Sequence, residues 1–320
     1  MSPQSFFTDL SLRGVLYYNY RDNCEGIPVE SKTADKNIRR DIAQSAESHV
    51  APDGRTYLII SLKTTASISS SQGISAKEVE ITALKQGIIP RRYLRNIGTI
   101  GLNGQIKLLH STVAVVGAGG LGSNVIELLA RQGIGHLIII DNDRFTEQNL
   151  NRQVMSTEGN LGEYKVIAAA KRVKEINSAT TVSTFLERLT KENAQSFLIG
   201  ARLVVDGLDN LSSRLVVEQA CRQLVIPYVY ASIAGFNGQL MTIFPGDVGL
   251  SSLYGSSSDT MPEQGIETRI GNPATTAAMI AALQVQEAVK IITGVGTPIR
   301  NQILLVDARE CAVNRIELGR

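Results

Sequence analysis

The sequence predicts an α/β fold: a doubly wound, mostly parallel sheet that finishes antiparallel, with a small N-terminal appendage. In the first half of the main domain, apolar runs of strand length alternate with amphipathic helical patterns, which is typical of a parallel sheet with helices on both faces. In its second half, apolar runs follow one another directly, which predicts antiparallel strands. A glycine cluster after the first strand of the series is typical of a ligand-binding α/β domain.

Length and composition fit a reduced, soluble, cytoplasmic protein. The 320 residues are 43% hydrophobic, enough for one large domain and an appendage. The net charge of +2 and the lack of a basic run give no reason to expect nucleic-acid binding. No apolar segment is long enough to span a membrane, and the start of the chain does not resemble a signal peptide. The three cysteines, Cys24, Cys221 and Cys311, form no CxxC pair.

Residues 1–73 are predicted to form the appendage, and residues 74–320 the main domain. The appendage has only short apolar patches, at Val15–Tyr18 and at Tyr57–Leu62. The second patch follows a turn signal and is interpreted as a strand. The serine-rich stretch 67–73 is interpreted as a linker or an exposed loop. The fold and the role of this region stay open.

The main domain begins with a helical pattern. Ser75 is predicted to cap a helix that Gly87 ends. The next segment leads into the first strand of the large sheet and contains Arg92 and Arg95, about one helical turn apart. Taken alone, this spacing indicates a solvated basic helix face.

The unit from Val113 to Asp141 indicates a nucleotide site. A buried strand, a glycine turn, an amphipathic helix and a second apolar strand follow one another, and Asp141 ends the second strand. The glycines of the turn are Gly117, Gly119, Gly120 and Gly122. Glycines let the backbone approach a phosphate, the helix start offers free N–H groups, and an acidic residue in this position accepts ribose hydroxyls. The simpler alternative is a tight turn without a ligand.

The remaining elements are predicted in chain order. Helices are expected at Tyr164–Ile176, from a Ser212 cap to just before Pro227, and at Pro273–Thr293, whereas 245–271 is expected to be a long loop, which is usually functional or disordered. Strands are expected at Val182–Leu186, Leu203–Asp206, Tyr228–Ile233, Gln239–Phe244, Ile303–Asp307 and Val313–Leu318.

The segment from Arg92 to about Leu318 resembles the ThiF/MoeB/HesA family of the ubiquitin-activating-enzyme-like superfamily. Six motifs occur in order: RYLRNI at Arg92, GAGGLG at Gly117, IIDND at Ile139, NLNRQ at Asn149, GEYK at Gly162 and DGLDN at Asp206. The resemblance implies a Rossmann-like domain that binds ATP and Mg²⁺. It also implies a homodimer that adenylates the C-terminal carboxylate of a small ubiquitin-like sulfur-carrier protein, or of a peptide precursor in some relatives.

The resemblance also implies roles for individual residues. Asp141 would hold the ribose, and the glycine turn would cover the phosphates. Asn149, Arg152 and Lys165 would contact phosphates, and Asp209 would hold Mg²⁺, which prefers carboxylate oxygen. Arg95 would reach the terminal phosphate in the neighbouring subunit. Each of three residues also has a simpler interpretation. Lys165 would be an exposed lysine at the start of a helix, Arg152 would form a surface ion pair, and Asp209 would belong to a turn.

The sequence departs from the family pattern in two places. Many members carry two CxxC pairs that bind a structural zinc, and here neither the region 244–254 nor the C-terminus supplies them. We therefore predict no zinc site. Members that form a thioester carry a cysteine in a stretch that corresponds to 259–276, which has none. Cys221 and Cys311 are both interpreted as buried structural cysteines, so we expect adenylation without an enzyme thioester.

Two functions of other classes compete with this prediction. An NAD(P)-dependent oxidoreductase shares the glycine turn and the acidic residue, but it does not explain Arg152, Lys165 and Asp209. A degenerate, non-catalytic binding module would explain the missing cysteines, whereas the intact nucleotide residues argue against it. The sequence does not identify the acceptor of the adenylyl group or the sulfur donor.

Overall fold

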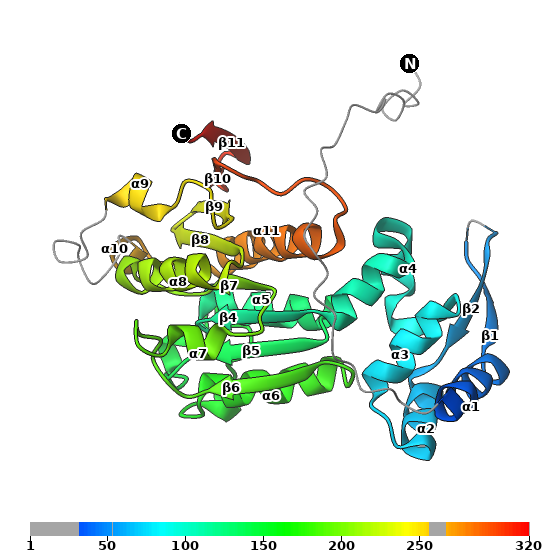
Figure 1. Cartoon of the computed structure of the whole chain (residues 1–320). Coiled ribbons are helices and arrows are strands. Elements are labelled where there is room, and N and C mark those ends of the chain that lie inside the picture. Colours follow the sequence, from blue (N-terminus) through cyan, green and yellow to red (C-terminus); the bar gives the residue numbers. More distant parts are fainter. Residues whose placement is uncertain (1–31, 53, 256–266, 320) are drawn as a thin grey trace.

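The computed structural model describes residues 32–52, 54–255 and 267–319. An eight-stranded sheet forms its centre, with the order β11-β10-β9-β8-β7-β4-β5-β6 (Figure 1). Neighbours from β8 to β6 are parallel, and β8, β9, β10 and β11 pair antiparallel. The predicted doubly wound sheet, mostly parallel and finishing antiparallel, is confirmed.

The elements of the main domain lie close to their predicted positions. Its strands are β4 (Thr112–Val116), β5 (His136–Ile140), β6 (Thr181–Phe185), β7 (Leu203–Asp206), β8 (Tyr228–Ala234), β9 (Asn237–Ile243), β10 (Gln302–Asp307) and β11 (Ala312–Glu317). Its helices are α4 (Leu94–His110), α5 (Gly120–Gln132), α6 (Lys165–Ile176), α7 (Ala194–Leu198), α8 (Leu211–Leu224), α9 (Leu250–Tyr254), α10 (Glu267–Ile270) and α11 (Ala274–Thr293). Short 3₁₀ turns lie at Arg91–Tyr93, Glu147–Asn149 and Glu158–Asn160.

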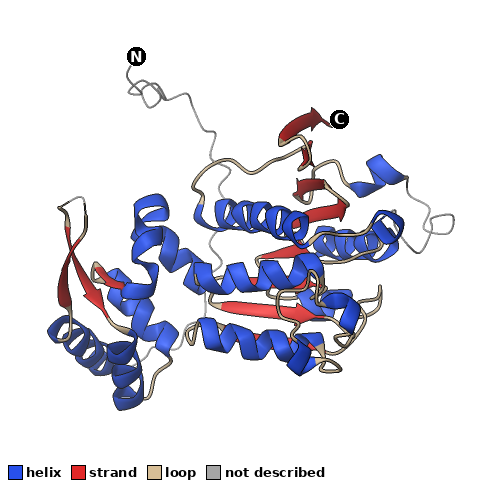
Figure 2. Cartoon of the chain, turned by 180° about the vertical axis from the view of Figure 1, so that it is seen from behind, coloured by secondary structure: helices blue, strands red, loops and turns tan. Residues whose placement is uncertain are grey.

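Helices cover both faces of the sheet. Helices α4, α5, α6 and α11 lie on the face that Figure 2 presents, and α7 and α8 lie on the other. Val113 and Val115 of β4 belong to the core with α5, α6 and α11, whereas Ala114 and Val116 belong to the core with α7 and α8. Because successive side chains of a strand point to opposite faces, β4 is buried on both sides, as its continuous apolar run predicts.

The N-terminal unit is a small α/β layer with its own core. It comprises α1 (Lys32–Gln44), β1 (Glu47–Val50), β2 (Thr56–Ile60), α2 (Leu62–Gln72), α3 (Ala76–Lys85) and β3 (Ile88–Pro90). The three strands form a separate sheet in the order β1-β2-β3. One hydrophobic cluster joins Ile42 and Ile68 to Val79 and Ile88, across the predicted boundary at residue 73. We therefore propose that the boundary follows β3.

The stretch 67–73 is not a linker, and that prediction was wrong. It forms most of α2 and its C-terminal cap. The Ser61 hydroxyl accepts a hydrogen bond from Thr64 N, Gly73 adopts a left-handed φ of 65°, and Thr65 and Ile68 are buried. Serine has only a modest helix propensity, so capping and burial of two side chains decide the conformation.

Arg92 does not belong to a solvated basic face. Its Nε lies 3.1 Å from Glu80 Oε1, and its guanidinium also donates to the Asn177 side chain, which follows α6. Glu80 is fully buried, and burial raises the pKa of its carboxyl to about 7 although the guanidinium opposes the shift. Arg95 is exposed. The RYLRNI segment therefore joins the N-terminal unit to the main domain through Arg92 and leaves Arg95 free to face outward.

Three smaller expectations are corrected or limited. Asn210, and not Ser212, caps α8: its side chain accepts from Ser213 N. The predicted loop 245–271 contains α9 and α10, and its residues 256–266 lie outside the described part, as does Val15–Tyr18. Within the described residues, no helix is both long and apolar enough to cross a bilayer.

Candidate active site

A cavity of about 340 Å³ lies at the carboxyl ends of the parallel strands. The residues that follow β4, β5 and β7 line it, together with residues of β8 and the residue before Pro273. Ligands bind at this edge in doubly wound sheets, where the strand order reverses. In this sheet the reversal lies between β4 and β7. The volume falls within the range of small-molecule sites, about 300–1,000 Å³.

The glycine turn has two kinds of positions. Gly117 has a φ of +90°, and a Cβ there would lie 2.5 Å from Gly207 O. A Cβ on Gly122 would lie 1.8 Å from Gly117 O, so both glycines are required by close packing. At Gly119 the nearest atom to an added Cβ is 3.8 Å away, and this residue lines the cavity. Among the glycines of the turn, Gly119 therefore leaves the most space for a ligand beside the backbone, whereas the Arg152 side chain lies against Gly120.

Asp141 organises the turn as well as facing the cavity. Its Oδ2 accepts a hydrogen bond from Ala118 N at 2.7 Å, and its Oδ1 accepts one from Asp143 N at 2.8 Å. Burial raises the pKa of the Asp141 carboxyl, and the charge of Lys165 opposes the shift. Each carboxylate oxygen keeps a second lone pair, so the group can still accept hydroxyl hydrogens of a ribose.

We predict that Asp141→Ala weakens ATP binding by about 1–3 kcal/mol, because charge-assisted hydrogen bonds are lost. Titration calorimetry with ATP and Mg²⁺ measures the change. Asp307→Ala is the matched control: Asp307 caps a turn by accepting from Arg309 N, and it lies outside the cavity lining. Equal ATP affinity of Asp141→Ala and wild type would remove Asp141 from the site.

Two cationic side chains face the cavity from different segments. Lys165 begins α6, is only 7% exposed, and its Nζ lies 2.8 Å from Asp143 Oδ2. The alternative of an exposed helix-start lysine is therefore wrong. Arg152 is half-buried and lies beside the turn, with its Cδ 3.5 Å from a Cβ built on Gly120. A buried lysine and an arginine next to a glycine turn suit an anionic ligand such as a chain of phosphates.

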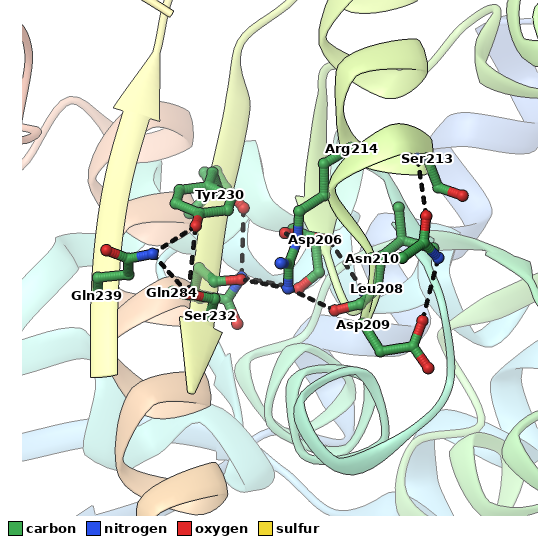
Figure 3. Close-up of polar contacts among 12 residues, drawn as sticks. Asp206, Leu208, Asp209, Asn210, Ser213, Arg214, Tyr230, Ser232, Gln239 and Gln284 are labelled. Carbon is green, nitrogen blue, oxygen red and sulfur yellow. Dashed lines mark hydrogen bonds and ion pairs between the residues drawn. The ribbon is translucent and has the colours of Figure 1, made fainter. Parts of the chain in front are cut away.

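The two aspartates of the DGLDN motif lie in opposite environments (Figure 3). Asp206 is fully buried and pairs with Arg214 Nε at 2.9 Å. Burial raises the pKa of the Asp206 carboxyl, which Arg214 opposes. Asp209 is exposed, lines the cavity, and accepts a hydrogen bond from the Asn210 side chain at 3.1 Å. The exposed carboxylate of Asp209 fits a role in holding Mg²⁺, which keeps several waters and binds through one or two carboxylates plus phosphate oxygens of a substrate.

The structure gathers most of the predicted site residues, but not all. The cavity lining contains Gly117, Gly119, Gly120, Asp141, Arg152, Lys165 and Asp209. Gly122 lies under the turn, and Asn149 is buried with its Oδ1 accepting from Thr146 N. Asn149 lines a shallower hollow that shares Lys165 and Asp143 with the cavity. Arg95 lines neither.

Sequence reasoning did not single out several lining residues. They are Glu187, Arg188, Leu189, Arg214, Ser232 and Asn272. Gln153 and Gly207 also line the cavity, and they belong to predicted motifs without having been given a role. Glu187 to Leu189 follow β6, so their place at the carboxyl end of a predicted strand was an available signal. Gly207 packs against Gly117 O, and a Cβ there would lie 2.4 Å from it. Only the pairing of β4 with β7 brings these two glycines together.

The two cysteines inside the described residues differ. Cys221 is buried on α8, as predicted, and burial raises the pKa of its thiol. Cys311 is exposed in the turn between β10 and β11, so its predicted burial was wrong. Strand β11, which follows Cys311, is itself exposed along most of its length, so its apolar residues do not indicate a buried region.

An ion pair holds the segment after β9, which is one of the two regions where the zinc-binding cysteines of the family pattern are missing. Asp247, with a side chain only 3% exposed, bonds Arg300 through two contacts, of 2.9 and 2.5 Å. Its Oδ2 also accepts from Phe244 N. Within the described residues there is no group of three metal-binding side chains. The absence of zinc stays a prediction.

We expect Asp247→Asn to lower the free energy of unfolding by about 1–3 kcal/mol, because it leaves hydrogen-bond partners of a buried carboxylate unsatisfied.

Treatment of the wild type with a chelator should leave its melting temperature unchanged. Thermal melting checks both, with Asp307→Asn as a control on a surface turn. Stoichiometric zinc by elemental analysis, with a melting temperature that falls on chelation, would contradict the metal-free fold.

The sheet is doubly wound, and one of its edges carries a glycine turn, an acidic group after the next strand and two cations. This combination is typical of nucleotide-binding α/β domains. The model of the ThiF family matches residues 93–320, and the chain belongs to this family as an enzyme of the adenylyltransferase class. It is 33% identical over 228 residues to the sulfur carrier protein adenylyltransferase of Thermus thermophilus, covering 69% of this chain and 83% of that protein. It is also 33% identical over 227 residues to the SAMP-activating enzyme E1 of Haloferax volcanii, covering 68% and 82%.

Solved structures share the fold. PaaA matches with a TM-score of 0.63 at 18% identity, over 87% of this chain and 99% of that one. E. coli MccB with ATP matches with a TM-score of 0.60 at 22% identity, over 80% and 83%. The match to PaaA covers more of the chain than the family model does, so the shared fold reaches into the N-terminal unit.

Proposed function

We propose that the chain uses ATP and Mg²⁺ to adenylate the C-terminal carboxylate of a small ubiquitin-like sulfur-carrier protein, without forming an enzyme thioester. The convergence of Gly119, Asp141, Arg152, Lys165 and Asp209 on one cavity supports it most directly. Relatives named for sulfur-carrier and SAMP activation support the choice of acceptor.

The proposed reaction needs alignment and charge neutralisation. A carboxylate oxygen of the acceptor attacks the α-phosphorus of ATP, and the bond to the bridging oxygen breaks, so that pyrophosphate leaves with the electron pair. Lys165 and Arg152 would stabilise the negative charge that develops on the phosphates. Mg²⁺, held by Asp209, would neutralise phosphate oxygens. Asp141 would fix the ribose so that the α-phosphorus faces the acceptor.

ATP–pyrophosphate exchange tests this proposal. Purified chain is incubated with ATP, Mg²⁺, labelled pyrophosphate and, in separate reactions, a thiamin-type carrier, a molybdopterin-type carrier and carriers whose terminal carboxylate is amidated. We expect exchange with at least one free carboxylate and none with its amide. Tight ATP binding without exchange for any of these carriers would contradict the proposed carrier acceptor.

A peptide precursor is the second candidate acceptor. MccB has been solved in complex with N-formylated MccA, and that structure matches this chain over 89% of its length at 22% identity. The family model does not cover the N-terminal unit. Contacts that select a peptide acceptor, in place of the carrier that relatives activate, would therefore come from this unit. The oxidoreductase alternative is set aside, because the chain belongs to an adenylyltransferase family.

A further inference from the structure

A polar cluster lies on β8 and β9 beside the cavity, outside the groups with a proposed role in the reaction. Gln239 Nε2 lies 2.7 Å from the Tyr230 hydroxyl and 2.8 Å from Ser232 Oγ (Figure 3). It also lies 2.5 Å from the Tyr254 hydroxyl. We call these four residues the Gln239 cluster. Ser232 also lines the cavity, so the cluster continues from the cavity.

The sheet fixes the cluster in place. Ser232 and Gln239 are direct partners in the antiparallel pairing of β8 with β9. Tyr230 lies two residues before Ser232, hence on the same face of β8. Tyr230 is only 1% exposed, whereas Tyr254, on α9, is 36% exposed. The cluster therefore runs from the buried sheet to the protein surface.

The cluster has more hydrogen-bonding capacity than it uses internally. The Gln239 amide has two hydrogens for three nearby hydroxyl oxygens, and each hydroxyl brings a hydrogen of its own. The Tyr230 hydroxyl donates to Ser232 Oγ at 3.2 Å and lies 3.2 Å from the Tyr254 hydroxyl, so these contacts use two of the three hydroxyl hydrogens at most. Within the described part of the chain, no hydrogen bond reaches Gln239 Oε1. At least one donor and one acceptor are thus available to a ligand. One peptide unit offers the complementary N–H and C=O.

The order of the strands shows which part of the reaction lies beside the cluster. Along the carboxyl edge, Asp141 follows β5, the glycine turn follows β4, Asp209 follows β7, and Ser232 lies near the end of β8. A nucleotide whose ribose lies at Asp141 and whose phosphates lie at the turn occupies the β5 to β7 part of this edge. The β8 part, with Ser232, is left for the group that attacks the α-phosphorus.

We propose that the Gln239 cluster is the binding subsite for the last peptide unit of the acceptor, holding an extended carboxyl-terminal chain by its main chain. This rests on the proposed adenylation. The subsite would act on any acceptor that ends in a free peptide carboxylate, because it contacts main-chain groups. Gln239 would be a positioning residue, since it contacts the acceptor next to the reacting carboxylate and not the carboxylate itself.

The test uses synthetic hexapeptides with a free carboxylate and varied final two residues. The full chain is incubated with ATP, Mg²⁺ and hydroxylamine, which converts an acyl-adenylate into a hydroxamate and releases AMP. Mass spectrometry identifies the peptide that is consumed best, and its KM and kcat are then measured. For Gln239→Met we expect about a tenfold rise in KM for the peptide, with kcat within about twofold and unchanged ATP affinity, the scale of one or two lost hydrogen bonds.

Three comparisons make the result specific. Gln219→Met, on the exposed side of α8, is the matched control and should match the wild type. Tyr254→Phe removes one hydroxyl at the surface and should raise KM by a smaller factor. A peptide whose last amide N–H is replaced by an ester oxygen should raise KM for the wild type but add little to the loss in Gln239→Met, because both changes remove the same contact.

The failures can be told apart. Absence of any hydroxamate from the wild type and all peptides and carriers, despite ATP binding, would overturn the proposed adenylation and this subsite with it. Hydroxamate formation with equal KM for wild type and Gln239→Met would overturn the subsite alone. Additive losses from the ester peptide and Gln239→Met would show that the cluster acts elsewhere, and would also overturn it.

Discussion

Asp209→Asn is expected to reduce ATP–pyrophosphate exchange by at least about a hundredfold, the scale of losing a preorganised electrostatic contact in a transition state. The substitution keeps the volume of the side chain but removes the charge that would hold Mg²⁺. Because Asp209 is exposed and, among the described residues, its side chain accepts a hydrogen bond only from the Asn210 side chain, the fold should be unaffected. Exchange at saturating carrier and Mg²⁺, together with thermal melting, measures both.

Asp206 supplies the contrasting variant. Asp206→Asn leaves Arg214 buried without its charge partner, so it should lower the free energy of unfolding by about 3–5 kcal/mol. The two substitutions are three residues apart and chemically identical, yet one should impair the reaction and the other the fold. An Asp209→Asn protein that exchanges as fast as the wild type would refute the metal-binding role.

Mixing two inactive variants is expected to restore activity if Arg95 acts across a dimer interface. The C-terminal end of helix α4 leads directly into the start of β4, at the opposite edge of the sheet from the cavity (Figure 1). Arg95 is exposed and outside the cavity lining. A trans role for Arg95 therefore requires a second copy of the chain to supply the contact. An arginine there would stabilise departing pyrophosphate, as arginine fingers do.

Arg95→Ala and Asp209→Asn should each be nearly inactive alone. In a mixed dimer, one site combines an intact Asp209 with the partner subunit's intact Arg95, so an equal mixture should recover about a quarter of wild-type exchange. If Arg95 acts within its own chain, neither site of the mixed dimer is complete. Formation of mixed dimers, shown by two affinity tags, without recovered exchange would therefore exclude the trans role. Arg91→Ala, a nearby exposed arginine, serves as the matched control.

Local sequence patterns predicted the part of the site that one strand–turn–helix unit contains. Gly117, Gly119 and Asp141 lie within 25 consecutive residues, and their relative positions follow from the standard geometry of strand and helix. The serine-rich α2 was not predicted in the same way. Its helical state depends on burying Ile68 against a core contributed by several other elements, and no local pattern reports that burial.

Residues of the same type within one motif have different roles, and only their surroundings in the structure distinguish these roles. Asp206 and Asp209 share one motif, but burial beside Arg214 makes the first structural and exposure leaves the second available to a ligand. Arg92 and Arg95 likewise share one motif. Arg92 contacts Glu80 and Asn177, whereas Arg95 stays exposed at the surface. Neither difference can be read from residue type or spacing.

The fold class, the strand–turn–helix unit of the nucleotide site and, through six motifs in order, the family could all be predicted from the amino-acid sequence. These depend on periodicity and on short spacings, which the backbone geometry of single elements sets. The Gln239 cluster and the packing of Gly207 on Gly117 can be recognised only in the tertiary structure. In each case the register of two paired strands brings residues together that are distant in the sequence. Register is specified by the burial of whole faces of a sheet, so it emerges only when all the strands are assembled.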